Sequence, residues 1–267
     1  LQGGDATTGM SDSMAPGDIA NLSQSSELAF RIVTNIAALP PQSQLYWRAM
    51  VLDEYDGRTW TASRRNQQPL FRYTEQPIAR LNYQYLAAEK QPKWIMGLET
   101  SVPNQAGYYV QQDGAIRKGL QRHTAPIDLI WLGKQNIHPI SAQVLKANQN
   151  YLSSKDLQAQ RLAQELFAQS GARPEVYIAQ VLNWYKSQGF GYSLNPGRLQ
   201  NDHIDDFLFR QRQGFCEHYA SSFVMLMRYV GIPARVVVGY QGGQAAPDGK
   251  TWEVRQLDAH AWSEVWL

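Results

Sequence analysis

The chain has 267 residues, a mass of 30.3 kDa and a formal net charge of +2. Hydrophobic residues make up 43% and charged residues 18%, a balance that excludes a disordered tail or a polyelectrolyte. No run of Lys or Arg provides the basic surface that nucleic-acid binding needs. The longest apolar stretches fall far short of the roughly 18 residues of a membrane span. These features indicate a globular protein with one or two domains.

The first half of the chain predicts strands. Residues 1–26 are rich in Gly, Ser, Asp and Thr and are expected to form a flexible lead-in. Residues 27–135 contain alternating apolar positions, and the pairs Asp56-Gly57 and Asp113-Gly114 supply hairpin turns. We therefore predict a β-sandwich-like domain over residues 27–135. The strand candidates are residues 28–32, 45–52, 59–62, 81–87, 94–98, the hairpin at 108–116, and 127–132.

The second half, residues 136–267, mixes helical and strand patterns. One helix is predicted from about residue 157 to the Ser-Gly pair at 170–171, and another from Pro174 to Gly189. A third begins at Cys216 and ends at Gly231-Ile232-Pro233, because Gly tolerates the left-handed cap and Pro cannot continue the helix. Three strands follow, at residues 236–240, 252–254 and 260–266. The predicted class is α+β, and the chain is expected to be a fragment that stops within its last domain.

A single cysteine excludes an intrachain disulfide and a multi-thiolate zinc site. Cys216 lies in the first turn of its predicted helix, where unpaired backbone N–H groups and the positive end of the helix dipole stabilise a thiolate. We therefore expect the pKa of Cys216 to be lowered from its usual value of about 8.5. The same N–H groups are able to bind the oxyanion of a tetrahedral intermediate. Taken alone, however, a lone cysteine is more often a small buried hydrophobic residue.

A thiol nucleophile needs a base, and His260 is the best placed histidine. It opens the strand over residues 260–266, and a sheet packed against the cysteine helix would bring the start of that strand beside Cys216. His218 follows Cys216 by two residues and points to another side of the helix. Without further context, a histidine at a strand end is more often a turn residue.

Three blocks of sequence add that context. Residues 214–220 (GFCEHYA), 228–240 with RYVGIPAR and a Gly-Tyr pair, and 258–265 (DAHAWSEV) resemble the transglutaminase-like core of the papain-like cysteine enzymes. In the first half, residues 46–48 (YWR) and 52–60 (LDEYDGRTW) resemble the bacterial, membrane-anchored members of that family. The resemblance implies that the β-rich domain precedes a papain-like core, with the cysteine helix packed on an antiparallel sheet. It also implies that Cys216 is the nucleophile and His260 the base.

The resemblance carries further expectations about surroundings and partners. It implies protein or peptide substrates, no nucleic acid, and no metal or cofactor, and the chain has no EF-hand-like acidic loop. It places the chain on the periplasmic side of the bacterial inner membrane, in a parent protein anchored by segments absent from this chain. The Asp that orients the histidine in the family is expected beyond Leu267.

Several residues are candidates for a supporting role. Asp258 is two residues before His260, which does not make it a substitute for the missing Asp. Tyr192 and Trp252 are candidates for lining an acyl-substrate cleft, although core or surface positions are equally compatible with aromatic residues. Glu217 and His218 are expected on the helix surface or behind the site. Arg228 and Arg235 are expected to form structural ion pairs.

The predicted reaction is acyl transfer. The thiolate of Cys216 attacks a carboxamide, such as that of a Gln side chain, and His260 protonates the departing ammonia. An amine or water then attacks the thioester. Two alternatives stay open: a cysteine peptidase or amidase acting on periplasmic or cell-wall peptides, and a binding or scaffold module without enzymatic activity.

Overall fold

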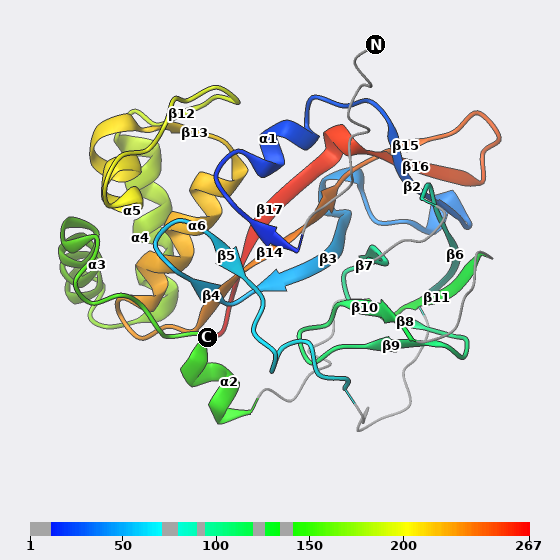
Figure 1. Ribbon diagram of the computed structural model, residues 1–267, viewed down its shortest axis with the longest axis horizontal. Helices are drawn as coiled ribbons and strands as arrows, with labels where there is room; N and C mark the ends of the chain where they lie inside the picture. The colour runs from blue at the N-terminus through cyan, green and yellow to red at the C-terminus, as the bar shows by residue number, and fades with distance from the viewer. Residues whose placement is uncertain (1–11, 71–79, 90–93, 120–125, 134–140) are drawn as a thin grey trace, which may run out of the picture.

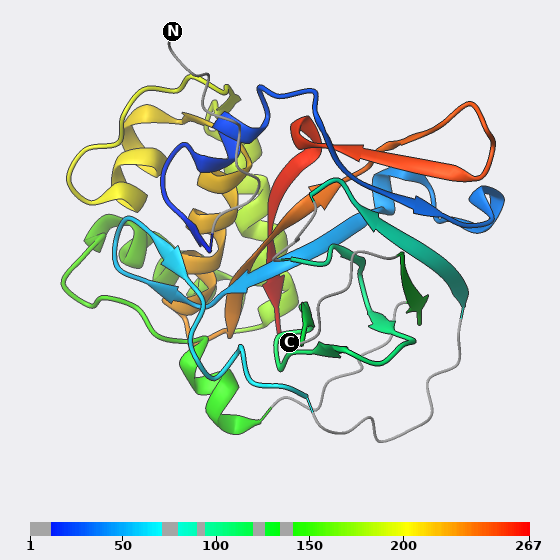
Figure 2. The same ribbon diagram turned by 45° about the vertical axis from the view of Figure 1, so that its right-hand side comes forward.

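The helices and the sheets occupy different sides of the molecule in the computed structural model. It describes residues 12–70, 80–89, 94–119, 126–133 and 141–267. Figure 1 shows the larger helices gathered on the left, with long strands crossing the centre and the strands β2, β6, β8, β11, β15 and β16 on the right. The helix α6 (Cys216–Arg228) lies between the other helices and the central strands, and the view in Figure 2 agrees. The mixed α+β class is therefore confirmed.

The sheet beside α6 has four antiparallel strands in the order β17-β14-β3-β7. Its central strand β14 is buried along almost its whole length, which accounts for the continuous run of valines at its centre. Strand β17 is the edge of this sheet, and His260 on β17 pairs with Gly239 on β14. The strands are β3 (Tyr46–Leu52), β7 (Gly97–Leu98), β14 (Ala234–Gln241) and β17 (Ala259–Val265).

A second, six-stranded antiparallel sheet has the order β15-β16-β2-β6-β11-β8. On β6, Leu81, Tyr83 and Tyr85 alternate with exposed residues, so one face of this strand packs on the core. The strands are β2 (Leu28–Val33), β6 (Leu81–Ala87), β8 (Ser101–Pro103), β11 (Ile127–Trp131), β15 (Gln244–Ala245) and β16 (Thr251–Arg255).

Short strands and helices complete the described part of the fold. The remaining strands are β1 (Ser13–Met14), β4 (Glu54–Tyr55), β5 (Trp60–Thr61), β9 (Tyr108–Val110), β10 (Ile116–Lys118), β12 (Gly191–Tyr192) and β13 (Gln213–Gly214). The other helices are α1 (Asp18–Leu22), α2 (Ala142–Ala147), α3 (Leu157–Gln169), α4 (Pro174–Ser187) and α5 (His203–Asp205). Short turns are η1 (Ile36–Ala38), η2 (Gln42–Gln44), the π-helical η3 (Asp206–Gln211) and η4 (Gln256–Asp258). Within the described residues, no helix combines the length and the apolar composition that crossing a bilayer demands.

Strands from the two halves of the chain share both large sheets. Strand β3 from the first half pairs with β14 from the second, and β2 pairs with β16 in the same way. The chain does pass from strands to helices between β11 and α2, close to the predicted boundary. The β-rich region nevertheless does not close on itself, because local alternation identifies a strand but not its partner. The two halves are parts of one packed core.

The predicted lead-in needs a correction over residues 13–22. This part forms β1 and α1, and Met14, Ile19 and Leu22 are buried. The apolar residues here are too sparse to show a period, yet they pack beside β5 and β17. Ordered contacts therefore replace the expected flexible segment at these positions.

Candidate active site

Cys216 is the first residue of α6, as the sequence predicts. The parallel pair β12–β13 leads into the helix, with Tyr192 opposite Gly214 and the Ser193 N–H bonded to the Gly214 carbonyl at 2.8 Å. Phe215 has an extended backbone and caps the helix start. A side chain at Gly214 would collide with the rings of His218 and Phe207, so glycine is needed there. This approach places Cys216 at the end of the helix where backbone N–H groups have no helical acceptor.

Helix α6 runs alongside the edge strand β17. The Ser263 hydroxyl donates to the Ala220 carbonyl at 3.2 Å, and the backbone N–H of Ala261 lies close enough to the Cys216 sulfur to favour the thiolate. The thiol therefore lies close to Ala261, the residue that follows His260 on β17.

His260 lies in an aromatic setting. Its ring centroid is 6.3 Å from that of Trp262 on the same strand and 6.5 Å from that of Tyr46 on β3. Burial lowers the pKa of His260 below its usual value of 6.5. At neutral pH the imidazole is therefore uncharged and able to accept a proton.

The resting state of Cys216 differs from the expectation. Burial raises the pKa of the Cys216 thiol to about 12, although the hydrogen bond from the Ala261 N–H and those from the first turn of α6 act in the opposite direction. The side chain is only 6% exposed, and removing a thiolate from water costs more than the helix terminus returns. The predicted lowering of the pKa is wrong, because position in the sequence does not reveal desolvation. The resting group is a neutral thiol.

Tyr192 lies directly at Cys216. Burial and the neighbouring Cys216 raise the pKa of the Tyr192 phenol, whose oxygen lies close to the Cys216 backbone N–H and thiol. The Tyr192 ring stacks parallel to Tyr219 with 6.4 Å between centroids, and Tyr192 is 66% exposed. The exposed Tyr192 ring therefore lies between the Cys216 sulfur and solvent.

The other predicted supporting residues have local partners. The Trp252 indole donates to the Gly242 carbonyl at 3.0 Å, in the hairpin that leads from β14 to β16. The Asp258 carboxylate accepts the Arg255 N–H at 3.0 Å and closes η4. His218 Nδ1 accepts the Phe215 N–H at 3.3 Å, and burial, followed by the nearby His203, lowers the pKa of His218 to about 4. These three hydrogen bonds are local, and none of them involves Cys216 or His260.

Glu217 is buried, which excludes the helix surface, one of its two expected positions. Its carboxylate accepts the backbone N–H groups of Gly17 and Ile19, which belong to α1 and the residue before it. The second oxygen, Oε2, has no hydrogen-bond partner within the described residues. Burial raises the pKa of Glu217 to about 7. A residue next to the cysteine therefore anchors a segment that lies about 200 positions earlier in the chain.

This buried carboxyl predicts a pH-dependent stability. Between pH 4.5 and 7 the unfolded state ionises Glu217 while the folded state keeps it protonated, so the free energy of unfolding falls as pH rises. The loss approaches roughly 3 kcal/mol above pH 7. In urea denaturation, Glu217→Gln is expected to remove this dependence. Glu175→Gln, at an exposed first-turn position of α4, is the matched control and should leave it intact. The same pH slope in Glu217→Gln and wild type would refute the assignment.

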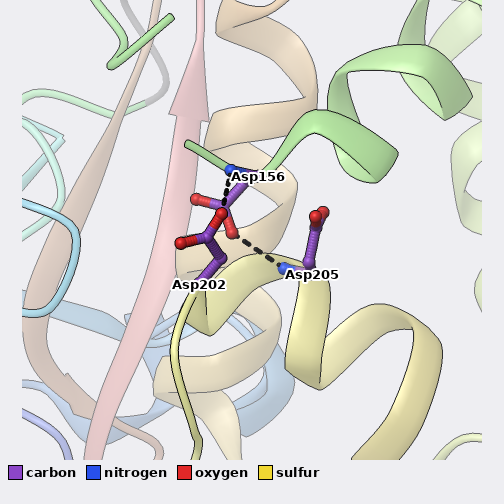
Figure 3. A group of neighbouring side chains, drawn as sticks. All are labelled: Asp156, Asp202 and Asp205. Atoms are coloured by element: carbon purple, nitrogen blue, oxygen red, sulfur yellow. Dashed lines mark hydrogen bonds between the residues drawn. The ribbon is translucent and has the colours of Figure 1, made fainter. Parts of the chain in front are cut away.

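A cluster of three aspartates elsewhere in the fold has a structural role. Asp156, Asp202 and Asp205 bring carboxylate oxygens within 4.8 Å of one another (Figure 3). Asp156 accepts the Asp205 N–H and its own N–H donates to Asp202, both at 2.9 Å. Asp205 in turn accepts N–H groups from the first turn of α3. The group thus joins the N-termini of α3 and α5 by reciprocal capping.

The geometry defines a class of protein: a cysteine at a helix start, beside the edge strand of an antiparallel sheet. A family model described as the transglutaminase-like superfamily matches residues 160–267, and a model of the TgpA N-terminal domain matches residues 1–127. The crystal structure of the periplasmic domain of TgpA from Pseudomonas aeruginosa has a TM-score of 0.88 at 35% identity, over 98% of this chain and 91% of that one. The same domain bound to ethylmercury gives 0.87 at 36% identity, over 97% and 92%.

The chain therefore belongs to the TgpA family, within the transglutaminase-like superfamily. A protein-glutamine gamma-glutamyltransferase of Pseudomonas aeruginosa strain PAO1 is 35% identical over all of this chain. The chain spans 40% of that protein's length. YebA of Bacillus subtilis strain 168 is 41% identical over 97 residues, which are 34% of this chain and 13% of YebA.

Proposed function

We propose that the chain catalyses acyl transfer from a glutamine carboxamide to a primary amine, with Cys216 as nucleophile and His260 as base. The observation that carries this proposal is the position of Cys216 as the first residue of α6, a helix that packs on β17 with Ala261, the residue after His260, close to the sulfur. The similarity to a protein-glutamine gamma-glutamyltransferase supports the reaction class.

The first half of the reaction forms a thioester. The neutral imidazole of His260 takes the thiol proton as the sulfur attacks the carboxamide carbon, because a resting thiol with a raised pKa needs a base at the moment of attack. A carbon–sulfur bond forms and a tetrahedral oxyanion develops. The carbon–nitrogen bond then breaks, and the imidazolium gives its proton to the leaving ammonia. The acyl group remains on Cys216.

The second half releases the acyl group. A primary amine attacks the thioester and loses a proton to His260, the carbon–sulfur bond breaks, and the thiolate recovers its proton. The product is an isopeptide bond. Water in place of the amine yields glutamate, so access of water to the thioester decides between transamidation and deamidation.

The oxyanion needs hydrogen-bond donors, and the Cys216 backbone N–H is one of them. The Tyr192 oxygen lies close to this N–H. We propose that Tyr192 turns aside when substrate binds and that its hydroxyl then donates to the same oxyanion. The high exposure of Tyr192 leaves its ring free to move.

The cellular location that we propose for this chain is based on its relatives. Two solved structures that align with almost all of this chain are periplasmic domains of TgpA, so we propose that this chain also works on the periplasmic side of the inner membrane. We also propose that it is part of an anchored parent protein and that its partners are protein or peptide substrates.

An amine-incorporation assay tests the proposed function. The protein is incubated with a glutamine peptide, with and without a fluorescent primary amine, and both ammonia release and amine attachment are followed. Transamidation predicts amine attached to the glutamine in proportion to the ammonia released. Ammonia release without attachment would assign deamidation. Cleavage of the peptide backbone would identify the peptidase alternative, and no turnover of any kind would favour a binding module.

The pH profile of kcat/KM provides a second check. Because burial lowers the pKa of His260, the imidazole stays neutral into mildly acidic solution. The acid limb of the profile is therefore expected to have its midpoint below pH 6.5. A midpoint above 6.5 would contradict the assignment of His260 as the base. The neutral thiol also predicts that no second limb of thiolate formation appears near neutral pH.

A further inference from the structure

A groove opens beside the N-terminus of α6, and its lining is cationic. The cavity has a volume of about 620 Å³, within the range of sites that hold small ligands. Phe215, the residue before Cys216, lines the groove together with His218. The groove therefore includes the residue that immediately precedes the proposed nucleophile, although Cys216 itself does not line it.

The two walls of the groove come from distant parts of the chain. One wall is α1 and the residues before it, which Glu217 holds through the N–H groups of Gly17 and Ile19. The other is the loop over residues 194–199, between β12 and α5, which Figures 1 and 2 show on the same side of the molecule as α1. Hydrogen bonds from Ser193 to Gly214 and from Gln200 to Asp206, both 2.8 Å, fix the two ends of this loop.

Among the described residues, the ionisable ones that line the groove are Arg58, Arg198, His203 and His218, and none of them is a carboxylate. Neither guanidinium has a carboxylate within 4.0 Å among the residues that the structure describes. An arginine pair that lacks counter-ions attracts an anion and binds a carboxylate in bidentate fashion.

Within the described residues the nearby acids form no direct ion pair with these arginines, although Asp56 interacts with the charge of Arg58 at longer range. Asp56, Asp202 and Asp206 act on the charge of His203 from outside the groove. Asp56 accepts the backbone N–H groups of Arg58 and Thr59, and Asp206 pairs with the Arg210 side chain. Asp202 accepts the Asp156 N–H. Each acid is therefore held by other donors.

Apolar side chains complete the lining and decide the kind of anion. Leu194, Pro196, Leu199 and Phe215 alternate with the polar and cationic positions. A surface that offers both apolar contact and guanidinium groups fits a peptide that carries carboxylates better than it fits a bare inorganic anion. We propose that this groove binds a carboxylate of the acyl-donor peptide, next to the glutamine that is presented to Cys216. The inference rests on the proposed function and names its substrate class.

The test uses two fluorescent peptides of equal length with one central glutamine. One has Glu on both sides of the glutamine, and the other has Ser at those positions. Kinetics are compared for wild type, Arg58→Gln, Arg198→Gln and the double variant, with the exposed Arg64→Gln as a control outside the groove. For the acidic peptide the double variant is expected to raise KM about tenfold with kcat unchanged. The neutral peptide and the control variant should show no change.

Two further arms separate this inference from the proposed function. In the wild type, added NaCl should weaken the binding of the acidic peptide but not that of the neutral peptide. This salt effect should disappear in the double variant. Direct binding to Cys216→Ala measures the groove without chemistry. Tighter binding of the acidic peptide that depends on both arginines supports the groove even if no acyl transfer occurs. Equal KM and equal binding of the two peptides in wild type, or no effect of the double variant, would overturn the inference.

Discussion

Cys216→Ala is expected to lower kcat/KM for amine incorporation by at least about 10⁴-fold, because the covalent route disappears with the sulfur. The substitution removes one small, buried atom from the start of α6 and leaves the backbone N–H groups in place. The fold should therefore remain intact in circular dichroism and thermal unfolding. Steady-state kinetics with a glutamine peptide and a fluorescent amine measure the effect.

Ser263→Ala is the matched control for this experiment. It removes the hydrogen bond from Ser263 to the Ala220 carbonyl, which joins β17 to α6 one helical turn beyond the sulfur. The control should lose about 1 kcal/mol of stability while retaining acyl transfer. If the control lost activity as completely as Cys216→Ala, packing of α6 on β17 would explain both results. Amide turnover that survives in Cys216→Ala would refute the mechanism.

Glu264→Gln is expected to have the largest effect on stability. Glu264 lies on β17 and bonds Arg48 at 2.6 Å and Arg235 at 2.7 Å, and the two arginine side chains are only 10% and 5% exposed. Although burial opposes it, the charges of Arg48 and Arg235 hold the pKa of Glu264 well below its usual value. Loss of the carboxylate leaves two buried cations with one fewer anion, which costs about 3–5 kcal/mol. Urea denaturation measures this as a lower midpoint with an unchanged slope.

The control is Glu253→Gln on β16. Glu253 pairs with Arg255 at 2.8 Å, but this pair is much more exposed, so the expected cost is below about 1 kcal/mol. The sign of the pH dependence gives a further check, because the folded pKa of Glu264 is lowered. Its stabilising effect is present above its usual pKa of 4.5 and is lost as pH falls through the folded value. Equal losses of unfolding free energy in Glu264→Gln and Glu253→Gln would contradict the stabilising role of the Arg48–Glu264–Arg235 network.

Local patterns predict much of this fold. The helix that begins at Cys216 is confirmed because Gly231 and Pro233 end it unambiguously. The last strand, which is predicted from its alternating apolar residues, is confirmed. It packs against α6, so Ala261 lies close to the Cys216 sulfur. Helices α3 and α4 also lie where Ser170-Gly171 and Pro174 place their ends. These features depend on neighbours within one or two turns, which a sequence displays directly.

Other features depend on contacts between distant segments. The pairing of β3 with β14 includes a bulge at Gly239, where a side chain would collide with the Trp47 carbonyl. The burial of Glu217 depends on Gly17, far earlier in the chain. The raised pKa of Cys216 reflects the combined burial by all these segments. None of them follows from periodicity or spacing, because each is set by tertiary packing.

Intact-protein mass spectrometry tests whether Cys216 forms a covalent acyl-enzyme. The protein is mixed with a glutamine peptide in the absence of amine, quenched in acid and measured intact. Covalent catalysis by Cys216 predicts a mass gain equal to the mass of the peptide less one ammonia. Digestion should locate the added mass on Cys216, and later addition of a primary amine should remove it. An unchanged mass during continued ammonia release, or an adduct on any other residue, would contradict covalent catalysis by Cys216.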